Sequence, residues 1–385
     1  MSGQAFGFVS SQTTVSGGAY RDYTDRVHFV SILDWQLQAI GSHGTEFYLD
    51  LGINNNLIQD AWNLYPQQMN ALLPISDDLK MRIGRFSMNE AMYFNLYDGA
   101  EVSYKINPSL EMKANAGNLT FLEETDELTD DHQLYALSFK YFKPSISIKL
   151  GHSLRYQDKN WQQLPYFQWF QKNDGRIPLD FSLDSRFNIE GNKIEKGHTQ
   201  IHSYFSDNYD VAYFYQIDHP EYSLPLRKNL WFRLTSTTDV ESHGVLQNYR
   251  YAETLDFSLN LERNDYRSKF REEAGEKVQA SMNVRWVEWM FSPSLTWIKS
   301  FGGKLISPAL EMKRSLSALS RVSLLVEASR YEKINRISGN ALLLRSSYQR
   351  FWNSDFMSAI SMDIERNHYY AFDVRGMIYV THFAY

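Results

Sequence analysis

The chain has 385 residues, with 39 Lys and Arg against 45 Asp and Glu, so its formal net charge is −6 and no nucleic-acid partner is expected. It contains no Cys, which excludes disulfides, thiolate metal sites and covalently attached haem within the chain, and we expect no cofactor. Its mean hydropathy is −0.45, and no stretch approaches the roughly 18–20 continuous apolar residues that a membrane-spanning helix needs.

The aromatic content points to a membrane–water interface. Tyr, Phe and Trp make up 15% of the residues, and Tyr and Trp favour such interfaces because each has an apolar ring and a polar tip. An aromatic-rich chain that is polar on average suits a β-barrel with one face in lipid and the other in water; a soluble all-β protein is the alternative. Residues 1–7 have neither the charged nor the apolar region of a signal peptide, so we expect the mature form of an exported protein.

Apolar and polar residues alternate along most of the chain, which predicts β-strands. The pattern is clearest in 146–156, 181–190, 255–262 and 322–329. A helix of these sequences would scatter its charges around the axis, because its period is 3.6 residues rather than 2. Each strand is therefore predicted to have one apolar and one polar face.

Turn-forming residues separate these strands. The Asn-rich region 54–78, with Pro66 and Pro74, is expected to hold one poor strand and a loop. Short turns on one rim and longer loops on the other are typical of outer-membrane barrels. The expected tight turns are 41–44, 107–109, 144–145 and 241–244, and the expected longer connections include 123–131 and 266–277.

These runs predict the fold class: all-β, a single transmembrane antiparallel β-barrel with an even number of strands, about 18–22. We expect residues 1–385 to form one such domain in the outer membrane of a Gram-negative bacterium. The expected partners are membrane lipid, lipopolysaccharide and the outer-membrane assembly machinery.

The most motif-like part of the chain is 82–86, Arg-Ile-Gly-Arg-Phe, followed by Asp-Gly at 98–99. It resembles the Gly-Arg-aromatic and Asp-Gly-hydrophobic pairing of several Gram-negative porin families, including alginate-export-type barrels. The resemblance implies that a loop, 87–96, folds into the lumen as a constriction. The alternative is that the glycines relieve crowding in the wall while Arg85 pairs with Asp98.

A channel is defined by what lines it, and here a charged face is predicted to point inward. Acidic and basic residues occur there in near balance, which predicts no strong preference between cations and anions. The alternative is that these charges pair across neighbouring strands and stiffen the wall. The residues predicted to line the pore are Asp50, Lys80, Arg82, Arg85, Asp98, Glu101, Lys105, Glu111, Lys113, Lys149, Arg155, Asp184, Arg186, Asp256, Glu262, Arg285 and Arg345.

The C-terminal strand, 377–385, resembles the signal that the outer-membrane assembly machinery reads. Its terminal aromatic residue and its bulky residues at alternate positions carry the resemblance, which implies that Tyr379, Phe383 and Tyr385 form the signal. We expect these three side chains on the outer face of the strand and His382 on the inner face.

No group of residues predicts an enzyme, because nothing brings a nucleophile, a base and a carboxylate together. His198 and His202 lie in a predicted strand, about 13 Å apart on one face, so we expect no metal site. The acidic stretch 123–131 is expected to be a solvated loop, with divalent-cation binding near lipopolysaccharide as the alternative.

Two functions remain open. The first is an outer-membrane channel that passes small hydrophilic solutes or ions passively. The second is an insulating sleeve around a partner, such as a multihaem cytochrome in an electron conduit, because a barrel of this size has a lumen wide enough to need a plug or a guest. In the second case any haem would belong to the partner.

Overall fold

The computed structural model describes residues 8–21, 27–41, 44–56, 61–90, 93–120, 133–157, 160–173, 178–219, 239–268, 271–300, 303–333, 338–366 and 373–384. They form one 22-stranded sheet. In chain order the strands are β1 (Phe8–Arg21), β2 (Val27–Ile40), β3 (Glu46–Asn56), β4 (Ala61–Pro74), β5 (Leu79–Glu90), β6 (Tyr93–Asn107), β7 (Leu110–Thr120), β8 (Gln133–Lys143), β9 (Ile146–Gln157), β10 (Asn160–Gln171), β11 (Leu179–Asn188), β12 (Lys193–Ser206), β13 (Tyr209–Asp218), β14 (Asp239–Ala252), β15 (Leu255–Ser268), β16 (Arg271–Trp286), β17 (Trp289–Ser300), β18 (Gly303–Ser317), β19 (Ser320–Lys333), β20 (Ser338–Phe351), β21 (Phe356–Arg366) and β22 (Asp373–Ala384).

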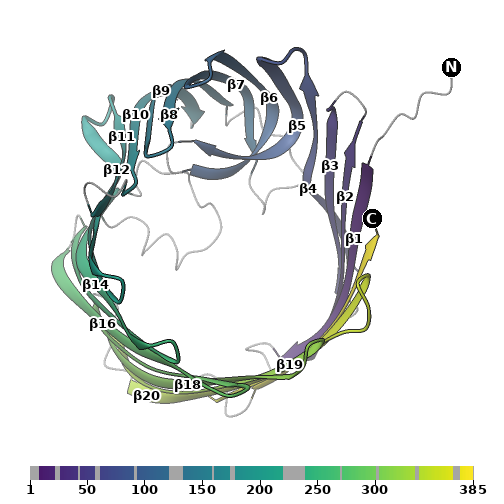
Figure 1. Cartoon of the computed structure of the whole chain (residues 1–385), viewed down its shortest axis with the longest axis vertical. Helices are drawn as coiled ribbons and strands as arrows, with labels where there is room; N and C mark the ends of the chain where they lie inside the picture. Colours follow the sequence, from purple (N-terminus) through teal and green to yellow (C-terminus); the bar gives the residue numbers. More distant parts are fainter. Residues whose placement is uncertain are drawn as a thin grey trace.

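Each strand pairs antiparallel with the next one in the chain, and β22 pairs with β1, so the sheet closes into a barrel (Figure 1). This order needs only hairpin connections, because neighbours in sequence are neighbours in space. The predicted all-β antiparallel barrel with an even number of strands is confirmed, at the upper end of the expected range. The described part of the chain contains no helix long and apolar enough to cross a membrane.

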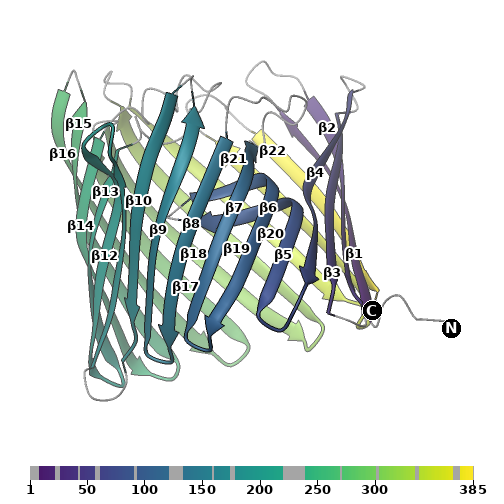
Figure 2. The ribbon, with the colours of Figure 1, turned by 90° about the horizontal axis from the view of Figure 1, so that it is seen from above.

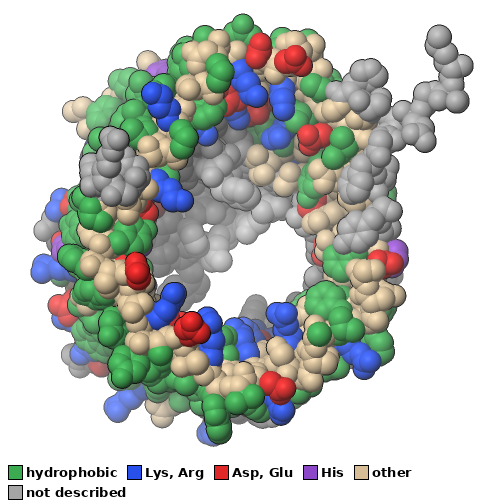
Figure 3. All heavy atoms as spheres, in the orientation of Figure 1, with side chains coloured by type: hydrophobic (Ala, Val, Ile, Leu, Met, Phe, Trp, Pro, Cys, Tyr) green, Lys and Arg blue, Asp and Glu red, His purple; other side chains and the backbone are tan. Residues whose placement is uncertain are grey.

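The two faces of the wall differ in the way that the alternation predicts. In β8, Tyr135, Leu137 and Phe139 are exposed on the outer face, whereas Leu134 and Ser138 on the other face are buried. The pairing register carries this alternation from strand to strand, so the parity of a residue tells which face it occupies. Figure 3 shows a bore through the molecule, and Lys and Arg side chains lie on its inner wall.

β1 begins and β22 ends at one rim, the lower rim in Figure 2. The predicted turns at 108–109 and 144–145 are confirmed, but two other expectations were wrong. Residues 241–244 lie inside β14, and most of 266–277 belongs to β15 and β16. Gly244 marks close packing rather than a turn, because a Cβ there would lie 2.5 Å from the ring of Phe214.

The region 54–78 contains a full strand, β4, with Pro66 inside it. Its register with β3 shifts between Asp50 and Leu51, so that Gln68 pairs with Asp50 and Pro66 pairs with Leu51. Such a bulge is one of the few places where a strand accepts proline, which has no N–H to donate to the ladder. The expected single irregular strand is thus β4, and the described residues 75–78 form the bend that follows it.

The outer face of β22 is the one opposite to our expectation. Ile378 is 55% exposed and pairs with Ile360 of β21, which is 51% exposed, so even-numbered residues face outward. Thr381 on the other face is buried, and its hydroxyl lies 3.1 Å from that of Thr14 in β1.

Tyr379 and Phe383 therefore share the inward parity of Thr381, and His382 points outward with Ile378. The physical reason is that pairing with two neighbouring strands sets the face of β22, whose own apolar pattern is divided between both faces. Tyr385 lies outside the described residues.

Candidate functional site

The upper ends of β5 and β6 bend inward as a β-hairpin that lies on the lumen side of the wall near β7 and β8 (Figure 1, Figure 2). We call this segment, 84–99, the inner hairpin. Pairing of β5 with β4 ends at Arg85 and Met69, whereas its pairing with β6 continues to Glu90 and Tyr93. The expectation of a loop at 87–96 was therefore wrong, because the described residues of this segment belong to the strands β5 and β6. The segment does lie inside the lumen, as the resemblance implied.

A row of three glycines sets the bend. Gly84, Gly99 and Gly117 face one another across β5, β6 and β7. Gly84 has a φ of +118°, and a Cβ on it would lie 2.2 Å from the backbone oxygen of Met69. A Cβ on Gly117 would lie 2.3 Å from the backbone oxygen of Asp98. Only glycine allows the backbones to approach this closely at the point where β5 turns inward.

Aromatic packing holds the inner hairpin against the wall. Phe86 and Tyr97 form a buried cluster with Leu134 of β8. The two rings meet edge to face with their centroids 5.5 Å apart, a favourable aromatic geometry. The Tyr97 hydroxyl donates a hydrogen bond to the carbonyl oxygen of Leu134 at 3.0 Å, and the guanidinium of Arg82 lies 5.4 Å from the centre of the Phe86 ring. The hairpin is thus positioned by contacts to β8 as well as by its own ladder.

Arg85 and Asp98 pair across the inner hairpin. The Arg85 Nε and Nη2 atoms donate to the two carboxylate oxygens of Asp98, each at 2.7 Å, and this bidentate form is the strong one. Arg85 and Asp98 lie on the same face of the β5–β6 ladder as the exposed Ile83. Arg82 and Glu101 lie on the opposite face. The inward fold and the Arg85–Asp98 pairing, which we had posed as alternatives, therefore occur together.

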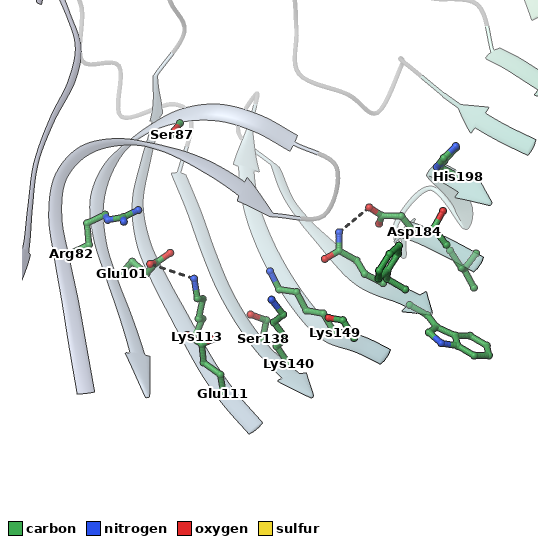
Figure 4. Close-up of a pocket in the computed structure, with 16 residues that line it drawn as sticks. Arg82, Ser87, Glu101, Glu111, Lys113, Ser138, Lys140, Lys149, Asp184 and His198 are labelled. Carbon is green, nitrogen blue, oxygen red and sulfur yellow. Dashed lines mark hydrogen bonds and ion pairs between the residues drawn. The ribbon is translucent and has the colours of Figure 1, made fainter. Parts of the chain in front are cut away.

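A pocket of about 570 Å³ lies beneath the inner hairpin (Figure 4). Arg82 and three lysines lie on one side of it together with Glu101 and Glu111, and Asp184 and His198 lie on the other. On the first side Lys113 forms an ion pair with Glu101 at 3.6 Å. The pocket is open to the bore, so a solute in the lumen can enter it. Its polar lining consists of Arg82, Ser87, Glu101, Glu111, Lys113, Ser138, Lys140, Ser147, Lys149, Gln168, Ser182, Asp184 and His198.

Other charged residues from the predicted set share the inward parity, and several have cross-strand partners. Glu262 lies 3.3 Å from Lys277, and Arg345 lies 2.8 Å from Asp363. Such pairs are those that the wall-stiffening interpretation expects. The set with inward parity outside the pocket is Asp50, Lys80, Lys105, Asp256, Glu262, Arg285 and Arg345.

Arg155 and Arg186 also have inward parity, but they are buried rather than solvated. Both bind Glu195, with Arg155 Nη2 3.2 Å from Oε1 and Arg186 Nε 3.0 Å from Oε2, and each of the three side chains is at most 1% exposed. The register of β11 and β12 shifts here and leaves Glu195 without a partner in the ladder. The alternation of apolar and polar residues did not predict Glu195 as a site residue, because this bulge changes the direction of its side chain. The two adjacent charged residues, Glu195 and Lys196, were the only sign of the bulge in this part of the sequence.

His198 and His202 lie on β12 with the same parity. Within the described ranges no group of three or more His, Cys, Asp or Glu residues is arranged to hold a metal ion. The acidic stretch 123–131 lies outside those ranges. Phe86 and Tyr97 were missed as site residues, because their place within the inner hairpin depends on a bend that the alternation does not encode.

No family model matches the chain. No curated protein matches it either. Among solved structures, the chain is similar to the P pilus usher (PapC) translocation pore, with a TM-score of 0.56, 9% identity and coverage of 98% of this chain and 99% of that one. It is similar to OpdQ of Pseudomonas aeruginosa, with a TM-score of 0.53, 7% identity and coverage of 98% of each chain.

The outer membrane protein OpdK of Pseudomonas aeruginosa is a third similar structure, with a TM-score of 0.51, 10% identity and coverage of 98% of this chain and 99% of that one. At these identities the likeness is one of fold. Along nearly its whole length, the chain is thus a closed 22-stranded antiparallel barrel similar in fold to outer-membrane β-barrels.

Proposed function

We propose that the protein is an outer-membrane channel of a Gram-negative bacterium that passes small hydrophilic solutes or ions, and that the inner hairpin is its constriction. The observation that carries the proposal is the hairpin itself, which projects into one side of the bore and is held there by the glycine row and by the Phe86–Tyr97–Leu134 cluster. A barrel of this size has a wide lumen, so it needs an internal element to select among solutes. Passive passage needs no catalytic residue.

The wall supports the proposed location. Exposed apolar and aromatic side chains occupy its outer face, and polar side chains occupy its inner face, which suits a barrel with lipid outside and water inside. Membrane lipid and lipopolysaccharide would then surround the protein. We keep Tyr379, Phe383 and Tyr385 as the proposed signal for the assembly machinery.

Single-channel conductance of the purified chain in a planar bilayer tests the channel. A steady opening is expected, and a silent barrel would contradict the proposal. A shortened variant, in which Asn-Gly replaces residues 88–95, tests the role of the hairpin; this dipeptide favours two-residue hairpin turns. The replacement joins Ser87 to Leu96, which face each other in the ladder. This variant should conduct more, and an unchanged conductance would contradict the role of the hairpin as the constriction.

The sleeve around a multihaem cytochrome receives less support, because the inner hairpin takes up lumen that a guest would need. A haem spectrum of the same preparation separates the two functions. Haem that co-purifies with a silent barrel would favour the sleeve, and a conducting preparation without haem would favour the channel.

A further inference from the structure

We propose that the wall has a lateral opening between β4 and β5, through which a single-chain amphiphile with an uncharged or zwitterionic head moves between the bore and the lipid leaflet at the upper rim of Figure 2. The inference rests on the proposed membrane location of the barrel, and it goes beyond the passage of hydrophilic solutes from rim to rim. It comes from the pairing of β4, from the path of β5 through the wall, and from the polar side chains at the point of crossing.

The hydrogen-bonded ladder between β4 and β5 stops part-way up the wall. β4 pairs with β3 from Ala61 to Leu72, but it pairs with β5 only from Met69 to Pro74. Within the part of the chain that the structure describes, residues 61–68 have no ladder partner on the β5 side, because β5 turns inward with β6 (Figure 2). In a membrane, an unpaired backbone group is costly unless it lies against protein or a water-filled cavity. This edge of β4 therefore calls for water.

The edge that β5 leaves lies at the depth of the apolar outer face. In β3, Leu51 and Ile53 have the same parity as Phe47, whose side chain is 43% exposed on the outside of the wall. Leu51 pairs with Pro66 and Ile53 pairs with Leu64, and both partners belong to the stretch 61–68. The interruption of the ladder is thus within the lipid-facing band rather than beyond the rim, where water would reach it in any case.

One face of β5 leads from the outside of the wall to the bore. Ile83, Arg85 and Ser87 alternate on that face. Ile83 is 43% exposed on the outer side, whereas Ser87 lines the pocket beneath the inner hairpin, which is open to the bore. The face changes sides because β5 bends at Gly84, so that its outer surface turns toward the lumen. Beside the unpaired edge of β4, β5 therefore presents a continuous surface from the lipid side to the bore.

A charged pair marks the point of crossing. Arg85 and Asp98 join through two hydrogen bonds of 2.7 Å, and their side chains are 12% and 22% exposed. The Asn70 side chain of β4 donates a hydrogen bond to the carbonyl oxygen of Arg85 at 3.2 Å, where the ladder between the two strands ends. Charged groups rarely face lipid, and in membrane proteins they usually line a water-filled path. The pair thus supports the presence of water at the same place as the interrupted ladder does.

The chemistry of the crossing favours an amphiphile over an ion. The pair has no net charge, and each carboxylate oxygen of Asp98 already accepts a hydrogen bond, so it offers little to a free ion. Met69 and Ile83 flank the pair on the outer side, 56% and 43% exposed, and give an apolar chain a surface to follow. A polar head can therefore move through the water beside the pair while its chain stays against apolar side chains and lipid.

Labelling of single cysteines in lipid vesicles tests the opening, because the chain has no cysteine of its own. Ser87→Cys places a thiol where β5 enters the bore, and Ser347→Cys is the matched control, on β20 across the bore (Figure 1). N-dodecylmaleimide, dissolved in the lipid, is the amphiphile. It should label Ser87→Cys at least about tenfold faster than Ser347→Cys, because reaching the control means taking its apolar chain from lipid through water.

A water-soluble, permanently charged thiol reagent should label these two variants at similar rates, since both thiols face the bore. Equal labelling of the two by N-dodecylmaleimide, or labelling of neither, would overturn the opening. A Ser87→Cys thiol that resists the charged reagent would overturn the path of β5 into the bore.

The charged reagent also tests whether water reaches the crossing. Met69→Cys should react, whereas Leu137→Cys should not, because Leu137 is 45% exposed on the outer face of β8, away from the interrupted ladder. An unreactive Met69→Cys would overturn a water-filled opening. Conductance separates this proposal from the channel: equal labelling in a conducting barrel would overturn only the opening, and selective labelling in a silent barrel would overturn only the channel.

Discussion

The hydroxyl of Tyr97 in β6 donates a hydrogen bond to the carbonyl oxygen of Leu134 in β8 at 3.0 Å, which ties the inner hairpin to the wall. Tyr97 is fully buried and Leu134 is 3% exposed, so water does not compete strongly for this bond. The position of the proposed constriction thus depends on a contact between two strands that are not neighbours in the sheet.

Tyr97→Phe removes this bond and keeps the ring. We expect the docking of the hairpin to weaken by about 1 kcal/mol, a typical net value for one hydrogen bond. Current noise in the open channel should rise, and mean conductance should increase. Tyr104→Phe is the control, because Tyr104 lies on the same strand with its side chain 42% exposed. Equal noise in the two variants would argue against the tie.

Gly84→Ala should destabilise the barrel by about 1–3 kcal/mol, because it places a Cβ against the Met69 oxygen at a φ of +118°. The control is Gly376→Ala, because a Cβ on Gly376 would meet nothing within 4 Å. The measurement is the urea midpoint of refolded protein in lipid vesicles. Similar midpoints for the two variants would show that the bend at Gly84 relaxes without cost.

Glu195→Ala leaves Arg155 and Arg186 buried without their shared carboxylate. Breaking a buried ion pair costs about 3–5 kcal/mol, so a large fall in the free energy of unfolding is expected. Glu332→Ala is the matched control, because Glu332 and its partner Lys304 are 4.0 Å apart and both well exposed. An exposed pair contributes less than about 1 kcal/mol. Comparable losses in the two variants would contradict a structural role for Glu195.

Arg82→Glu should shift the ion preference of the channel toward cations, because it reverses a charge in the pocket beneath the hairpin. The shift in reversal potential should shrink at high salt, which screens the charge. Arg314→Glu is the control, because Arg314 pairs with Glu288 at 3.1 Å at the lower rim. A reversal potential that stays unchanged in Arg82→Glu would place this residue away from the ion path.

The alternation was reliable where a strand had one clearly apolar face. Phe257 and Leu261 are exposed on the outer face of β15, and Asp256 and Glu262 have the opposite parity, as the sequence of this strand predicts. A period of two is a local property that each strand carries in its own residues. The fold class therefore followed from the sequence, although the length of the individual connections did not.

Local patterns misled where a residue has more than one structural use. Gly244 was read as a turn, but it lies in β14 against the ring of Phe214. Pro66 was taken as a sign of a poor strand, and it lies at a bulge in the 14-residue strand β4. In both cases the decisive neighbour is on another strand, so the residue type alone does not identify the role.

The sequence by itself determined a closed antiparallel barrel that is apolar outside and polar inside, because period and turn chemistry are local. Only the tertiary structure decided which face of β22 points outward, how Glu195 joins Arg155 and Arg186, and that the hairpin beyond Gly84 bends into the bore. These features depend on register and close packing between strands. Their energies arise from contacts between residues far apart in the chain, which no local pattern records.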